Sequence, residues 1–117
     1  MNIRVQSILE HMLEDAQDAV KFAKEIGSAE AFSANKLYRK AVIMSILNIG
    51  ELAKNLPQDY KLAHNEIPWK KIAGRRDIAA HGYHVMDDDI VWDVVMNSLP
   101  DLVRFLQGQL NNTGEKT

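Results

Sequence analysis

The residues best suited to chemistry in this chain are concentrated between Gly74 and His84. This eleven-residue stretch holds two arginines, two histidines, one tyrosine and two glycines. Arginine can bind a phosphate group through two parallel hydrogen bonds and stays charged at physiological pH. Histidine titrates near neutral pH and can therefore move a proton. The combination predicts chemistry on a phosphate ester.

Arg76 and His81 are the pair within this stretch that could act on one phosphate. Five residues on a straight α-helix correspond to a rotation of roughly 140°, so the two side chains would not share a helix face. Either the helix unwinds at His81 and Gly82, or a second copy of the chain supplies the missing group. The second arrangement predicts a symmetric dimer whose two-fold axis passes near this helix.

RNA is a phosphate ester that carries its own nucleophile, the 2′-hydroxyl group. An arginine and a histidine are sufficient in principle to deprotonate that hydroxyl and to stabilise the crowded phosphorus, without a metal ion. Two other interpretations stay open on spacing alone. The chain could be a binding module without catalysis, or a structural helical dimer in which the Arg-His pair belongs to the interface.

Metal binding is the less favoured interpretation of the neighbouring ligand-type residues. His81 and His84 could share a helix face, but a zinc site needs further ligands and no third one can be placed. The run from Asp87 to Asp89 is explained by the capping of a helix start, where carboxylates accept hydrogen bonds from free N–H groups. We therefore expect no metal and no cofactor.

Length and composition predict one all-α domain. A chain of 117 residues suits a single domain with a real core, and 46% of its residues are hydrophobic. Strand-like alternation is scarce, and there are only six glycines and three prolines. The absence of cysteine excludes disulfides and thiolate metal sites.

Charge and hydropathy limit the possible cellular location and the possible partners of the protein. The N-terminal sequence predicts no secretory signal, and no apolar run reaches the roughly 18 residues of a transmembrane helix. We expect a cytoplasmic protein that does not contact a membrane. The net charge of −2 argues against a general nucleic-acid coat. It still allows a local basic site, because Lys70, Lys71, Arg75 and Arg76 follow one another with no acidic residue between them.

Apolar residues at helical spacing predict an up-and-down bundle of four to five helices. Leu37 and Met44 are counted among the apolar positions of a central second helix, and Pro100 is expected to bend the last helix or to break one of its hydrogen bonds. Residues 1–110 form the expected domain, and residues 111–117 form a flexible polar tail. The helices are expected over Ile3–Ile26 with Gly27 as its stop, from Ser33 or Asn35 to Leu56, from Pro68 to Ala80 or His81, and from Asp87 to Leu110, with shorter helical turns near Ala29–Phe32 and Tyr60–His64.

A series of short motifs, taken in order and with its spacing, resembles one known family. The series is Ile49-Gly50-Glu51, Ile67-Pro68-Trp69, Ile72-Ala73-Gly74, Arg76-x4-His81-x-Tyr83, Asp89-Ile90-Val91-Trp92 and Leu99-Pro100. It is similar to the HepT-like branch of the HEPN superfamily, and the similarity extends from about Ile8 to Leu110. Each piece alone is short, whereas the ordered series is quite specific.

The resemblance implies a helical bundle that dimerises across the motif-bearing helix. It implies a metal-independent endoribonuclease that acts as the toxin of a type VII toxin–antitoxin pair. The partner would be an MNT-type nucleotidyltransferase antitoxin, which transfers AMP to the motif tyrosine and silences the toxin. Arg76 and His81 would be catalytic, Tyr83 would be modified, and Arg75 would help to hold RNA phosphates.

Asp77 departs from the family pattern, which usually has asparagine at that position. An amide can donate a hydrogen bond to a phosphate, whereas an ionised carboxylate cannot donate and repels phosphate. Asp77 can instead pair with Arg75 or Arg76, or favour the protonated form of His81. This substitution keeps open the alternative of a catalytically lapsed HEPN module that docks a nucleotidyltransferase or a nucleotide.

Overall fold

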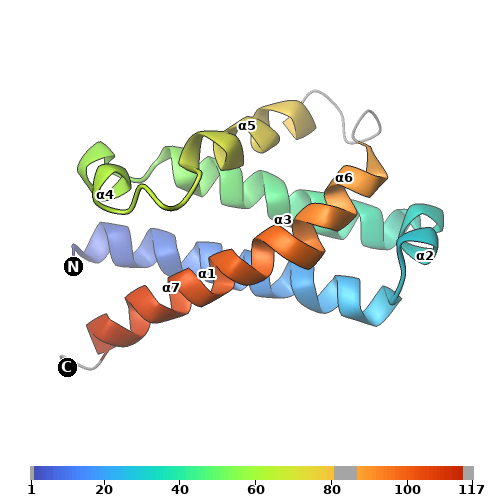
Figure 1. The fold of residues 1–117 in the computed structure, drawn as a ribbon, viewed down its shortest axis with the longest axis horizontal. Helices are drawn as coiled ribbons and strands as arrows, with labels where there is room; N and C mark the ends of the chain where they lie inside the picture. Colours follow the sequence, from blue (N-terminus) through green and yellow to red (C-terminus); the bar gives the residue numbers. More distant parts are fainter. Residues whose placement is uncertain (1, 81–86, 115–117) are drawn as a thin grey trace.

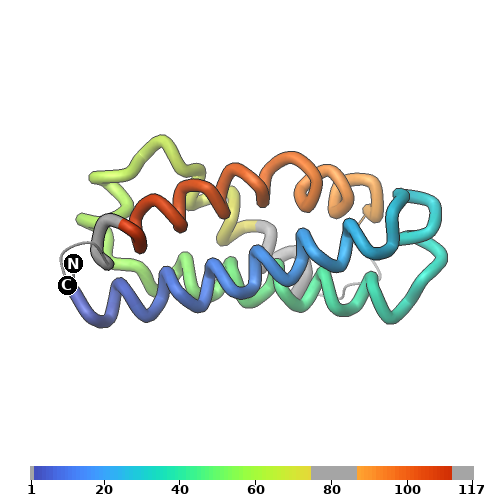
Figure 2. Tube along the Cα trace, turned by 90° about the horizontal axis from the view of Figure 1, so that it is seen from below, coloured from blue at the N-terminus to red at the C-terminus, as the bar shows by residue number. Residues whose placement is uncertain are grey.

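The computed structural model describes residues 2–80 and 87–114, and it gives only the backbone for residues 75–80 and 112–114. Over these ranges the chain is helical and contains no strand. Four long rods alternate in direction along the chain, and the two termini lie at the same end of the molecule (Figures 1 and 2). The all-α fold predicted from the sequence is confirmed.

The first rod, α1, spans Ile3–Ile26, the range predicted from its apolar stripe. Asn2 caps its start, with Oδ1 accepting from the backbone N–H of Arg4 at 2.7 Å. Gly27 ends it with φ +88°, a left-handed conformation that a side chain would strain. The buried residues of the stripe face the rest of the bundle, and they are Val5, Ile8, Leu9, Met12, Ala16, Ala19 and Ala23.

The helix α3 is the central rod, because it packs against both α1 and α5. It spans Lys36–Lys54 and follows the short helix α2, Ala29–Ala34. Val42, Ile43, Ile46, Ile49 and Ala53 point into the core. Leu37 and Met44 are apolar positions of this helix that lie outside the core, since their side chains are 75% and 56% exposed. They lie seven residues apart, so they share one face of α3, and that face is turned to solvent.

A short helix, α4 (Gln58–Ala63), connects α3 to α5, which spans Trp69–Ala80. Trp69 is buried, and its indole Nε1 donates to the carbonyl of His64 at 3.1 Å. Trp69 also meets Phe105 edge-on, with ring centroids 6.1 Å apart. This contact brings the start of α5 against the last rod, so the tryptophan is a core residue.

The last rod consists of α6 (Asp88–Asp93), the π-helical turn η2 (Val94–Ser98) and α7 (Leu99–Gly114), which follow one another without a gap. In the π turn, Leu99 N–H donates to the carbonyl of Val94, five residues back. Pro100 follows at once, and its ring would clash with the carbonyl of Met96 in a regular helix. The wider turn relieves that clash, so the irregularity predicted near Pro100 takes the form of a π turn.

The end of this rod differs from the prediction. The helix α7 continues to Gly114, four residues beyond the expected end at Leu110. Asn111, Asn112 and Thr113 have only modest helix propensity, which is why the sequence favoured an earlier stop. Regular backbone hydrogen bonding carries the helix through these residues nevertheless. None of the helices in residues 2–80 and 87–114 is long and apolar enough to cross a membrane.

Candidate functional site

The motif predicted to carry the chemistry begins on the last turns of α5. The backbone of Arg75, Arg76 and Asp77 lies within this helix, whose last residue is Ala80. This agrees with the predicted end of the motif-bearing helix. His81 and Tyr83 lie outside the described residues, as do Gly82 and His84. The structure therefore places the arginine end of the motif on α5. That Arg76 and His81 act on one phosphate stays a prediction.

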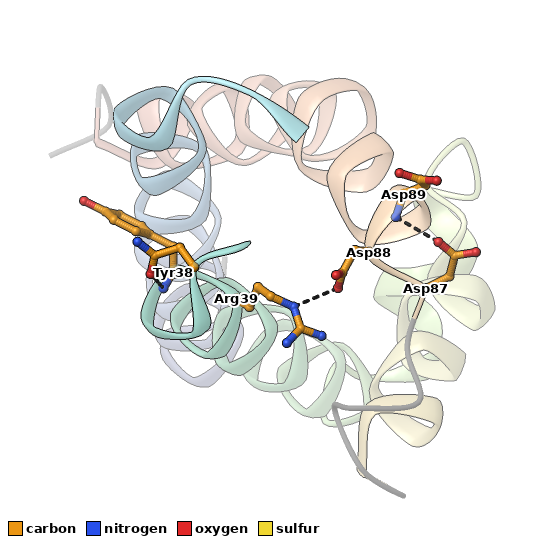
Figure 3. A network of polar contacts seen from close by, with 6 residues as sticks. Tyr38, Arg39, Asp87, Asp88 and Asp89 are labelled. Atoms are coloured by element: carbon orange, nitrogen blue, oxygen red, sulfur yellow. Dashed lines mark hydrogen bonds and ion pairs between the residues drawn. The ribbon is translucent and has the colours of Figure 1, made fainter. Parts of the chain in front are cut away.

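The chain resumes with three successive aspartates at the start of α6, two of which have distinct side-chain roles. Asp87 is the N-cap, and its Oδ1 accepts from the backbone N–H of Asp89 at 2.8 Å. This confirms the capping role expected for the acidic run. Asp88 instead points across to α3, where its Oδ1 accepts from Nε of Arg39 at 2.9 Å (Figure 3). Its role is therefore to join two helices.

The ion pair between Arg39 and Asp88 is partly shielded from water, with side-chain exposures of 18% and 22%. Because α3 also packs along α5, it contacts both helices that flank residues 81–86. Thus α3 supports both of the helices, α5 and α6, between which residues 81–86 lie in the sequence. The sequence analysis missed Arg39, because its partner is 49 positions away and no spacing rule connects them.

The basic character predicted near the motif is present on the first turn of α5. Lys70 and Lys71 are exposed, and this turn contains no acidic residue. The positive end of the helix dipole lies in the same place, so the site attracts anions from both sources. Lys70 also lines a groove that it shares with Lys54 and Lys61. The sequence analysis did not connect these last two residues with the motif.

Ligand-type side chains do not gather into a metal site in the described part of the chain. No group of three or more histidine, aspartate or glutamate residues there is arranged to hold a metal ion. Asp87 is engaged in capping and Asp88 in the pair with Arg39. The expectation that catalysis proceeds without a metal stays a prediction, since His81 and His84 lie outside the described residues.

Comparisons with known proteins connect this arrangement to a family. The family model described as Ribonuclease HepT-like matches residues 12–108. The chain belongs to the HepT-like ribonuclease family. The match includes most of α1, all of α3 and α5, most of the last rod and the motif Arg76-x4-His81-x-Tyr83, so the resemblance found in the sequence is confirmed. This HepT-like chain is thereby a member of a ribonuclease family, which confirms the predicted enzyme class at that level.

Several relatives agree with this assignment over most of their length. The HepT-like chain is 35% identical over 94 residues to a protein named "Putative RNase" from Caldanaerobacter subterraneus subsp. tengcongensis, covering 80% of this chain and 83% of that one. It is 34% identical over 103 residues to another of that name from Methanocaldococcus jannaschii, covering 88% and 84%. It is 37% identical over 93 residues to "Probable ribonuclease HepT" from Thermococcus cleftensis, covering 77% and 84%. No solved structure matches the chain.

Proposed function

We propose that this protein is a metal-independent endoribonuclease toxin, and that Arg76 and His81 form its catalytic pair. The observation that carries the proposal is the family match over residues 12–108, which includes both residues. The fold supports it, because α5 presents the backbone of Arg75 and Arg76 one to two turns before the helix reaches Ala80. The ion pair between Arg39 and Asp88 anchors the far side of the same segment.

The proposed reaction uses the substrate's own nucleophile. His81 takes the proton of the 2′-hydroxyl, the 2′-oxygen forms a bond to phosphorus, and the bond from phosphorus to the 5′-oxygen breaks. Arg76 binds the non-bridging oxygens through its guanidinium group, where negative charge grows in the transition state. The leaving 5′-oxygen takes up a proton from water, the proton held by His81 returns to the solvent, and the products are a 2′,3′-cyclic phosphate and a 5′-hydroxyl. Arg75 contributes a further cation for a neighbouring phosphate.

The decisive experiment compares RNA cleavage by the wild type, His81→Ala and Asp77→Asn in the presence of EDTA. We expect the wild type to give 2′,3′-cyclic phosphate ends and His81→Ala to be inactive. A strand with 2′-O-methyl groups should resist cleavage, because it lacks the nucleophile. Activity that appears only in Asp77→Asn would instead identify a lapsed nuclease, in which the carboxylate repels the phosphate. Cleavage by His81→Ala at the wild-type rate would reject the proposed site.

The homodimer belongs to the same proposal, since a second copy could complete the site. This dimer is expected across the motif-bearing helix α5, and the exposed Leu37 and Met44 of the neighbouring helix α3 offer apolar surface that would extend the contact. We expect Met44→Lys to shift the protein from dimer to monomer in light scattering. Met96→Lys is the matched control, because Met96 is 44% exposed on the π turn. An unchanged dimer in Met44→Lys would exclude this face of α3 from the interface.

Control by an MNT-type nucleotidyltransferase antitoxin completes the proposal. The transferase would attach AMP to the hydroxyl of Tyr83, releasing pyrophosphate from ATP, and the added phosphate and adenosine would obstruct the site. Co-expression with such a transferase should add the mass of one AMP to the wild type and none to Tyr83→Phe. Growth arrest by the toxin should be relieved only where the modification forms. Relief of arrest without any mass change would point to inhibition by docking.

A further inference from the structure

A groove at the start of α5 collects positive charge in a protein whose net charge is −2. It is bounded by the end of α3, by α4 and by the first turns of α5, and its volume is about 440 Å³. Lys54, Lys61 and Lys70 line it, one from each helix, and none of its lining residues is acidic. Three cations from three separate helices thus surround one hollow.

The hollow on the other side of the α4–α5 connection has a different charge. Ile67 and Pro68 line both hollows and separate them. The second one is lined by Glu66 and Asp101 together with a single cation, Lys71. The positive character is therefore confined to one side of the connection. An anionic ligand would be attracted to the groove with the three lysines and repelled from its neighbour.

The groove is held in shape by contacts that do not depend on a ligand. The ammonium group of Lys61 donates to the carbonyl of Ala53 at 3.3 Å, which ties α4 to the last turn of α3. This leaves two further N–H groups of the ammonium available to a ligand. Trp69 fixes the opposite wall through its bond to His64 and its burial in the core. Contacts within the protein thus connect the three helices that form the groove.

Apolar surface accompanies the charge. Leu62 is 66% exposed and lines the groove beside Ile67 and Pro68. A nucleic-acid strand presents phosphates on one side and the faces of sugars and bases on the other, so it matches a groove that combines lysines with apolar surface. A small inorganic anion would use only the charged part. The positive end of the α5 dipole adds to the attraction for phosphate.

The groove also continues toward the motif along α5. Lys70 and Ala73 both line it, three residues apart on one face of the helix. Arg75 and Arg76 follow on the next turn, so the distance along the helix axis from Lys70 to Arg76 is roughly 9 Å. A strand held at the motif would therefore reach the groove within a few nucleotides.

We infer that this groove of Lys54, Lys61 and Lys70 is an auxiliary site for the backbone of single-stranded RNA, which binds substrate on one side of the cleavage site. The inference rests on the proposed ribonuclease function, because that function supplies the strand. The lysines act on phosphates and carry no base specificity, so the site contributes affinity and leaves the choice of sequence to other contacts.

The test measures binding separately from cleavage, with a fluorescent single-stranded 2′-O-methyl RNA that cannot be cut. The groove variant is Lys54→Gln with Lys70→Gln, both exposed lysines. The matched control is Lys21→Gln with Lys24→Gln, two exposed lysines of α1 that change the net charge equally. Adding Lys61→Gln to the groove variant extends the series, and thermal unfolding checks that each variant is folded.

We expect the groove variant to bind at least tenfold more weakly than the wild type near physiological salt, and the control to stay within twofold. The slope of log K against log salt should decrease by roughly 1 to 1.5, since each lost single-strand phosphate contact contributes about 0.7. On cleavable RNA, KM should rise while kcat stays near the wild-type value, because the groove holds substrate without touching the reacting atoms.

Equal weakening in both variants would overturn the inference, because bulk charge would then explain it. Wild-type affinity in the groove variant would also overturn it and would leave an acidic protein partner as the occupant to consider. Failure of the wild type to bind RNA at all would do the same. If the wild type binds RNA through the groove but leaves cleavable RNA intact, the proposed catalytic function fails and the groove assignment stands.

Discussion

Arg39 of α3 and Asp88 of α6 form an ion pair, with 2.9 Å between Nε and Oδ1, at the point where the chain resumes after the motif. The pair has a structural consequence for the site. The helix α3 packs along α5 and also binds the first turn of α6, so both sides of residues 81–86 are held by the same rigid element. The geometry of the motif should therefore depend on a residue that takes no part in the reaction.

Breaking this pair should lower both stability and activity. Arg39→Met and Asp88→Asn should each reduce the free energy of unfolding by about 1–2 kcal/mol, because each leaves a partly buried charge without its partner. The double variant should lose less than the sum, which measures the coupling between the two side chains. Urea unfolding gives the free energies. RNA cleavage by Arg39→Met should fall as well, because the start of α6 loses its attachment to α3.

The chain offers a control in a second ion pair of the same residue types. Arg104 and Asp101 are paired on the surface of α7, with side-chain exposures of 68% and 73%. Arg104→Met and Asp101→Asn should change the free energy of unfolding by no more than about 0.5 kcal/mol, since exposed pairs contribute little. Coupling between Arg39 and Asp88 as small as in this exposed pair would show that α6 is held by packing alone.

Gly74 lies inside α5 next to the motif, and open space surrounds it. A methyl group added there would meet no heavy atom within 4 Å, and the same is true of Gly108 in α7. Gly74→Ala and Gly108→Ala should therefore each raise the free energy of unfolding by roughly 0.5–1 kcal/mol, because alanine restricts the unfolded chain and favours the helix. Thermal unfolding measures both. A loss of stability at Gly74 alone would reveal a contact that forms in solution, for example with a second copy.

Local patterns predicted the elements, whereas contacts between distant residues escaped prediction. The apolar stripe and Gly27 gave the bounds of α1 because both signals are local in sequence. The exposure of Leu37 and Met44 escaped prediction, because apolar character alone does not tell which face of a central helix is covered. The pair of Arg39 with Asp88 depends on how α3 and α6 meet in space. No sequence spacing encodes that meeting, so the support of the site could not be predicted.

In the candidate site, too, local sequence patterns predicted some features, and contacts between distant residues escaped prediction. The position of Arg75 and Arg76 on a helix that reaches Ala80 followed from helical periodicity and is confirmed by α5. The groove depends on lysines from three helices, and only Lys70 belongs to the basic cluster visible in the sequence. Lys54 and Lys61 join it because α4 turns the chain back beside α3, an arrangement that only the folded chain reveals.

Tyr60 should titrate well above an ordinary tyrosine. Burial, and secondly the charge of Glu66, raise its pKa to about 12. Its hydroxyl donates to Oε1 of Gln109 at 3.0 Å, which joins α4 to α7. Because the folded state holds the proton more tightly, the protonated phenol stabilises the fold fully below the unfolded pKa, and this contribution is lost as the pH rises toward 12. Tyrosinate absorbance should show a late-titrating group near pH 12 in the wild type.

The variant Tyr60→Phe should remove that late-titrating group and flatten the alkaline part of the stability curve. At neutral pH it should cost about 0.5–1.5 kcal/mol, the usual contribution of a hydrogen bond to stability. Tyr38→Phe is a useful comparison, because the exposed hydroxyl of Tyr38 donates to Glu25 and its loss leaves α4 and α7 untouched. If the late group persists in Tyr60→Phe, the assignment of that titration to Tyr60 is wrong.

The carboxyl of Asp15 on α1 should give a pH dependence of the same origin, the burial of an ionisable group, but in the acid range. Its partial burial raises the pKa of the carboxyl, and a hydrogen bond from Asn48 of α3 opposes the shift. The folded state therefore favours the protonated acid, so the stability present below the unfolded pKa is lost as the pH rises through the folded pKa. At neutral pH the charged form carries this penalty, and Asp15→Asn should raise the free energy of unfolding there.

The gain in Asp15→Asn should shrink as the pH falls toward the unfolded pKa of an aspartate, because both proteins are then uncharged at this position. Glu10→Gln removes one charge from an exposed position of the same helix and so controls for the change in net charge. Urea unfolding at neutral and acid pH measures the difference for each variant. A destabilised Asp15→Asn at neutral pH would mean that the hydrogen bond from Asn48 outweighs the burial, and that the carboxylate ties α1 to α3.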